Sequence, residues 1–210
     1  MDRAFRLLAT AQRPDAARPA DRNGDWSVAS FVAVLRMDLE PPEAIELRRI
    51  VAATDGLDEL VTSISVPRHP DDRSGSHGLR AELLFGGRLE RREQPYESYF
   101  QNVIALAGPL AAGGEHDYAI RLTMPPGQPM APHYVHVPFA QTDHFTLHAR
   151  FPPDRVPQRI WRLSGVPPVV IYEREPNSDL LQADRFGEVR CEFRDLARGR
   201  GYGISWEPSA

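Results

Sequence analysis

The chain has 210 residues, of which 41% are hydrophobic and 26% are charged, and its net charge is −4. These values are typical of a globular protein with its own core, and the acidic balance gives no overall attraction to nucleic acid or to acidic membranes. All 25 positive charges are arginines, which excludes a phosphate-loop lysine, a kinase strand lysine and a Schiff-base lysine.

The sequence also indicates the cellular compartment in which the protein is expected. No segment approaches the roughly 18 apolar residues of a membrane span, and the apolar run near the N-terminus is too short for a signal peptide. The single cysteine cannot form an internal disulfide. We therefore expect a cytoplasmic protein that does not enter a membrane.

In chain order, residues 1–24 are rich in Ala, Arg, Pro and Asp and are expected to form a flexible tail. From Trp26 onward, apolar and polar residues alternate in short segments bounded by Gly and Pro, a pattern typical of β-strands joined by turns. About ten strands are expected among the segments 26–37, 44–53, 60–66, 79–85, 88–93, 99–107, 116–124, 133–139, 144–151, 160–163, 169–172, 189–194 and 202–206.

This pattern predicts an all-β fold, an antiparallel β-sandwich of immunoglobulin-like or related type, over residues 25–207. Residues 208–210 would form a short tail. Two packed subdomains are an alternative, because the first half alternates less cleanly than the second. We expect no helix of ordinary length, and at most one helical turn at 179–182.

The histidines of the stretch 116–151 are candidate site residues. His144 and His148 share a strand face but lie about 13 Å apart, which is too far to bind one metal ion. A hairpin that pairs Phe139 with Phe145 would place His136 opposite His148 on the outer face, with Cβ atoms about 5 Å apart. This pair is a weak metal or acid–base candidate, and a solvated polar face is the simpler interpretation.

Other chemical motifs are weaker still. Cys191 alternates in phase with core residues and is expected to be buried. There is no Gly-x-Ser-x-Gly elbow, so we assign no catalytic and no cofactor-binding residue, and no cofactor is indicated. Aromatic side chains could line a ligand or partner surface, although core packing is their commoner use; the candidates are Trp161, Tyr99, Tyr134 and Trp206.

Several stretches together resemble a known family. They are HDYAIRLTM (116–124), PPGQPMAPHYVHVPF (125–139), RIWRLSGVPP (159–168) and DRFGEVRCEF…GRGYGISW (184–206). They resemble the β-rich region that follows the helix-turn-helix in certain actinobacterial regulators of the XRE type. The resemblance implies a sensory or assembly role and no active site. The helix-turn-helix itself is not found in this sequence, so direct binding of nucleic acid is not expected.

The leading hypothesis is a non-catalytic binding or sensory module, associated with transcriptional regulation, that contacts a protein partner or a small-molecule ligand. One alternative is a small metal- or acid–base-dependent enzyme that uses His136 and His148. Another is a structural protein that forms a homo-oligomer. The fold class does not separate these hypotheses, because β-sandwiches serve all three purposes.

Overall fold

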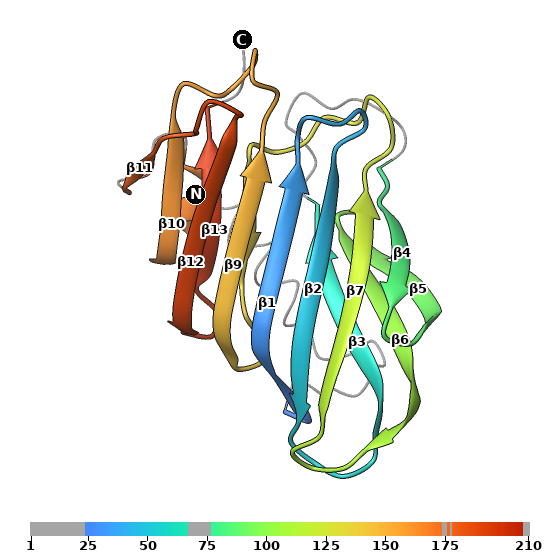
Figure 1. Ribbon diagram of the computed structural model, residues 1–210. Coiled ribbons are helices and arrows are strands. Elements are labelled where there is room, and N and C mark those ends of the chain that lie inside the picture. Colours follow the sequence, from blue (N-terminus) through green and yellow to red (C-terminus); the bar gives the residue numbers. More distant parts are fainter. Residues whose placement is uncertain (1–23, 67–76, 174–175, 177, 208–210) are drawn as a thin grey trace.

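The computed structural model describes residues 24–66, 77–173, 176 and 178–207, and this part of the chain is built almost entirely of strands (Figure 1). The strands are β1 (Trp26–Arg36), β2 (Glu43–Ala52), β3 (Leu57–Ser65), β4 (Arg80–Phe85), β5 (Arg88–Tyr96), β6 (Tyr99–Leu110), β7 (Glu115–Thr123), β8 (His133–His136), β9 (Thr142–Arg150), β10 (Ile160–Val166), β11 (Leu180–Leu181), β12 (Glu188–Leu196) and β13 (Gly201–Trp206). No helix in the described ranges is long and apolar enough to cross a membrane. The predicted all-β class is confirmed, with more strands than the ten expected.

The strands form three sheets. The largest has six strands in the order β12-β9-β1-β2-β7-β4, and the others are a four-stranded sheet, β11-β10-β13-β8, and a three-stranded sheet, β3-β6-β5. All pairings are antiparallel except that of β1 with β9. A strictly antiparallel arrangement was therefore wrong at this position, where the long intervening chain allows β9 to return beside β1 in the same direction.

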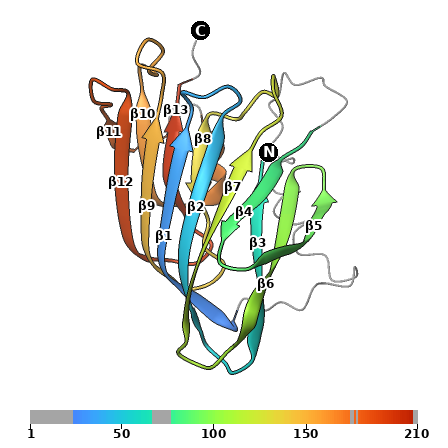
Figure 2. The same cartoon turned by 45° about the vertical axis from the view of Figure 1, so that its right-hand side comes forward.

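The two smaller sheets cover one face of the six-stranded sheet (Figures 1 and 2). The four-stranded sheet lies behind β12, β9 and β1, and the three-stranded sheet lies behind β7 and β4. Aromatic rings fill the interior: Phe145 stacks on Phe31 at 4.7 Å and on Phe193 at 5.5 Å, and Phe193 meets Tyr202 of β13 at 5.7 Å. Within the described part of the chain, no other sheet covers the opposite face of the six-stranded sheet.

The chain passes from the six-stranded to the three-stranded sheet at Gly86 and Gly87, between β4 and β5. Gly86 has a φ of +87°, and a Cβ there would lie 2.5 Å from the Cα of Tyr118. Only glycine fits this close approach of two backbones. This Gly-Gly turn thus joins two layers of the sandwich.

Two local predictions were wrong. Residues 169–172, expected as a strand, lie in the 3₁₀-helix η1 (Pro168–Tyr172), because Pro167 and Pro168 lack the N–H groups that a sheet ladder requires. The helical turn expected at 179–182 is instead the short strand β11, which pairs with Ile160 and Trp161 of β10.

Candidate functional site

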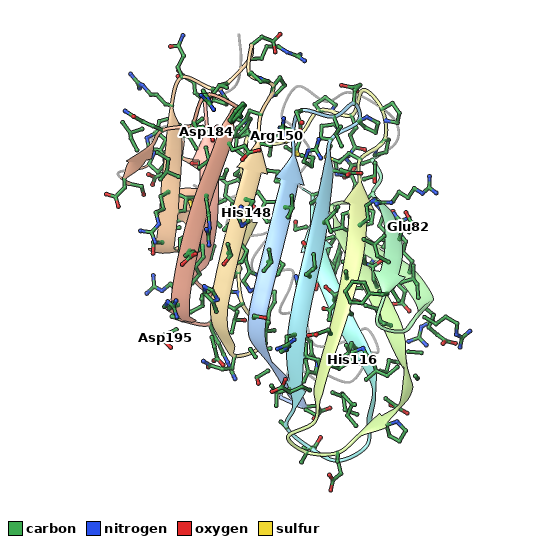
Figure 3. All side chains as sticks on the ribbon, viewed as in Figure 1. Glu82, His116, His148, Arg150, Asp184 and Asp195 are labelled. Carbon is green, nitrogen blue, oxygen red and sulfur yellow. The ribbon has the colours of Figure 1, made fainter. Side chains whose placement is uncertain are left out.

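The strand registers place the outer-face side chains of the six-stranded sheet in rows across its strands, and Figure 3 labels Glu82, His148 and Arg150 on this face. The strand registers define three rows, each named from β12 to β4. The central row is Glu192, Thr146, Val32, Leu47, Ala119 and Phe85. The middle row is Arg190, His148, Val34, Ile45, Arg121 and Glu82. The end row is Glu188, Arg150, Arg36, Glu43, Thr123 and Arg80.

The middle of this face is apolar. We call the residues Val32, Val34, Ile45, Leu47, Ala119 and Phe85 the outer-face patch. They are contiguous, because they occupy neighbouring positions in the central and middle rows. Leu47 is 39% exposed and Phe85 is 49% exposed, whereas Ala119 between them is fully buried. Val32, Val34 and Ile45 are half-buried, so Leu47 and Phe85 are the members of the patch that are most open to solvent. Contiguous apolar patches of this kind mark interaction surfaces, unlike apolar residues scattered singly.

Ion pairs border the outer-face patch. At the end row, Arg150 lies 3.3 Å from both Asp38 and Glu188. In the middle row, Arg121 lies 3.1 Å from Glu82. Beyond the opposite side of the patch, Arg49 binds Asp117 through two hydrogen bonds of 2.8 Å. An apolar centre with a polar border is the usual anatomy of a protein–protein interface.

The border carboxylates are held in their charged form. The hydrogen bond from Arg36 keeps the pKa of Asp38 below its usual value, and burial opposes this shift. The hydrogen bond from Arg49 likewise lowers the pKa of Asp117. Each carboxylate is thus satisfied by an arginine of its own chain, so a docked partner need not supply a countercharge.

The inner face of the same sheet carries a second polar group, here called the inter-sheet cluster: Glu46 and Arg48 of β2 with Tyr134 and His136 of β8. Glu46 accepts hydrogen bonds of 2.7 Å from the Tyr134 hydroxyl and from Arg48 Nη2. The side chains of Arg48 and Glu46 are only 9% and 6% exposed. The cluster therefore links the six-stranded sheet to the four-stranded sheet through a buried ion pair.

Aromatic rings enclose this cluster. The Arg48 guanidinium lies 4.2 Å from the centre of the Phe31 ring, and the His136 ring meets Phe31 at 4.9 Å and Phe145 at 5.4 Å. Within the described residues, His136 Nε2, Arg48 Nε and the Tyr118 hydroxyl are buried without a hydrogen-bond partner. The arrangement holds the sheets together and presents no reactive group to solvent.

The environment shifts the protonation equilibria inside the cluster. Burial, followed by the nearby Arg48 charge, holds the pKa of His136 well below its usual value. Burial and the Glu46 carboxylate raise the pKa of Tyr134. Both residues are therefore neutral near pH 7, and Glu46 with Arg48 forms the charged pair.

The predicted pairing of His136 with His148 was wrong. β8 pairs with β13, where His136 lies opposite Tyr202, whereas His148 lies on β9 opposite Val34 and Arg190. The two histidines thus occupy different sheets, and His148 lies on the outer face (Figure 3). The expected hairpin does not form because β8 ends at His136, before Pro138, and the chain then crosses to the six-stranded sheet. The expected partner residue Phe139 is 61% exposed.

The structure does not bring the four predicted aromatic residues onto one surface. Trp161 and Trp206 are buried at 5% and 7% exposure, and Tyr134 belongs to the inter-sheet cluster. Tyr99 lies on the three-stranded sheet, where its ring is 6.3 Å from that of Tyr96.

Two further features are minor. Cys191 is buried, as predicted, and burial raises the pKa of its thiol to about 11, which disfavours a nucleophilic role. A polar hollow of about 280 Å³ is lined by Arg49, Glu115, His116 and Asp117. Across the described ranges, no group of three or more His, Cys, Asp and Glu side chains is placed to hold a metal ion.

Sequence reasoning missed both the inter-sheet cluster and the outer-face patch. The signal for the inter-sheet cluster lay in the segment 44–53, where Glu46 and Arg48 share the phase of Ala44, Ile50 and Ala52. A charged pair in the core phase of a strand indicates a buried interaction. The outer-face patch required the pairing of β1 with β2, β7 and β9, which no local pattern specifies.

No protein-family model matches the chain, and no curated protein matches it significantly. Among solved structures, the chain is similar to an M1 zinc metallopeptidase from Deinococcus radiodurans, at 13% identity and a TM-score of 0.45, over 86% of this chain and 42% of that one. A mutant of the same enzyme bound to a Tyr-Ser-Ala substrate gives 13% identity and a TM-score of 0.44, over 87% and 43%. The chain thus spans less than half the length of these proteins, and likenesses at this level carry no functional conclusion.

Proposed function

We propose that this chain is a cytoplasmic, non-catalytic binding module that docks a protein partner through the outer face of its six-stranded sheet. The observation that carries the proposal is the outer-face patch itself. Its aliphatic residues from β1 and β2 are in register at the centre of the sheet, and paired charges surround them. A sheet face that served only as a solvated surface would carry polar residues at these central positions.

A protein partner fits this surface better than a small ligand does. Ligand pockets are concave and enclose most of the ligand, whereas the patch lies on an open sheet. The hollow beside Arg49 is polar, and the Arg49 guanidinium already donates a hydrogen bond to Asp117. The resemblance to the β-rich region of XRE-type regulators is what associates the partner with transcriptional regulation.

The proposal is tested by site-specific photocrosslinking in the organism that produces the protein. A benzophenone side chain replaces Leu47 in the patch or, as a matched control, Leu180 of β11, which is 63% exposed. We expect a discrete crosslinked protein from position 47 and none from position 180. Equal capture at the two positions, or no capture at position 47, would refute docking through this face.

A further inference from the structure

We propose that the partner docked on this face is a second copy of the same chain, related by a two-fold axis that runs parallel to the strands between β1 and β2. This inference rests on the proposed function and names its occupant. The axis passes through the middle of the sheet, because β1 and β2 are its two central strands (Figure 1). It would place β1 over β2, β9 over β7 and β12 over β4 of the other copy.

The apolar residues then meet apolar residues. Because the axis is parallel to the strands, each row of one copy faces the same row of the other. Val34 faces Ile45 in the middle row, and Val32 faces Leu47 in the central row. Each contact occurs twice, as an isologous interface requires. In the central row, Thr146 faces Ala119, so no charge is inserted into the centre of the interface.

The charged residues meet opposite charges under the same operation. The facing pairs are Arg80 with Glu188, Glu82 with Arg190, and Arg36 with Glu43. Two arginines face no carboxylate: Arg150 faces Thr123 in the end row, and Arg121 faces His148 in the middle row. Electrostatic complementarity between facing rows suppresses wrong pairings and fixes register. Phe85 faces Glu192, which Arg190 neutralises within its own copy.

The size and shape of the face also suit a symmetric dimer. Six strands about 4.8 Å apart, with about eight residues each at about 3.3 Å, give a projected area of roughly 800 Å². A standard interface buries about 800 Å² on each partner. Two copies of one sheet have the same twist, which favours aligned face-to-face packing at about 30°. Facing positions on β1 and β2 keep this register at any angle up to about 30°, whereas those on β12 and β4 face each other where the strands of the two copies are nearly aligned.

The test measures the mass of the full chain by sedimentation equilibrium at micromolar concentrations. We expect twice the 23.6 kDa chain mass. Leu47→Arg should weaken the dimer by at least about 30-fold, the loss expected at an interface hot spot. Leu180→Arg is the matched control and should leave the dimer unchanged. Circular dichroism and the urea midpoint of each variant check that it is folded.

A charge exchange tests the symmetry itself and does not depend on Leu47. Glu82→Arg and Arg190→Glu should each weaken the dimer, and the double variant should recover it, since the two positions face each other across the axis. A double variant as weak as the singles would overturn this geometry. A wild-type chain that sediments as a monomer would overturn the dimer. If a monomeric chain still captures another protein at position 47, the proposed function stands; without capture, both proposals fail.

Discussion

A surface strand usually has apolar residues on its inner face and polar residues on its outer face. The two faces of β2 show the reverse. Its inner face buries a glutamate and an arginine, Glu46 and Arg48, between two sheets. Its outer face presents Ile45 and Leu47, and Leu47 is 39% exposed. The inner charges are tolerated because each has a partner, whereas no sheet formed by the described residues covers the outer aliphatic residues. In the proposed function, the protein's own sandwich covers one side of this strand and a docked protein covers the other.

The largest expected effect comes from breaking the inner charge pair. Glu46→Ala would leave the Arg48 guanidinium buried without its carboxylate, so we expect unfolding free energy to fall by about 3–5 kcal/mol. Urea denaturation followed by circular dichroism measures the loss. Glu82→Ala, which removes an exposed carboxylate from the outer face, is the matched control and should cost less than about 1 kcal/mol in the monomer. Equal losses would mean that the inter-sheet cluster is not the stronger link.

A smaller loss is expected when only the hydroxyl that joins the sheets is removed. Tyr134→Phe keeps the ring but deletes the 2.7 Å hydrogen bond to Glu46. Hydrogen bonds to charged groups contribute about 1.5–3 kcal/mol, and the same urea experiment would detect this. Tyr99→Phe on the three-stranded sheet controls for the loss of a tyrosine hydroxyl elsewhere. A Tyr134→Phe variant as stable as the wild type would show that Glu46 does not depend on this bond.

The histidines of β8 should also make stability dependent on pH, whereas the border carboxylates act only in stronger acid. Burial keeps the pKa of His136 well below its usual value and that of His133 at about 4. The unfolded chain therefore binds more protons than the folded chain below the ordinary histidine pKa of about 6.5. Stability should be complete above that pH and should decrease as the pH falls toward about 4.

Urea midpoints measured between about pH 7 and pH 5 isolate this histidine effect, because Asp38 and Asp117 protonate only at lower pH. His136→Phe should reduce the slope of stability against pH, and the double variant with His133→Phe should reduce it further. A slope that is the same in the wild type and the double variant would contradict the assignment to these two histidines.

The sequence predicted the fold class and most strands, because alternation of apolar and polar residues is a local signal. It predicted the core position of Cys191 for the same reason. The sequence did not predict which strands pair with each other. His136 and His148 are close in the chain, yet β8 pairs with β13, and β9 pairs with β1 and β12. The outer-face patch could not be foreseen either, because it unites strands that are far apart in sequence.

The smallest expected effect on folding completes the contrast between the two faces of β2. Ile50 is fully buried on the inner face, so Ile50→Ala should lower unfolding free energy by about 2–5 kcal/mol. Leu47→Ala removes a side chain that the monomer leaves exposed, and should change unfolding free energy by less than about 0.5 kcal/mol.

Both variants are measured at protein concentrations low enough to keep the chain monomeric, because association would add to the apparent stability. At higher concentration, Leu47→Ala should lose the concentration-dependent part of that stability while Ile50→Ala keeps it. If the Leu47→Ala monomer were strongly destabilised, Leu47 would contribute to the fold itself. That result would contradict docking through the outer face.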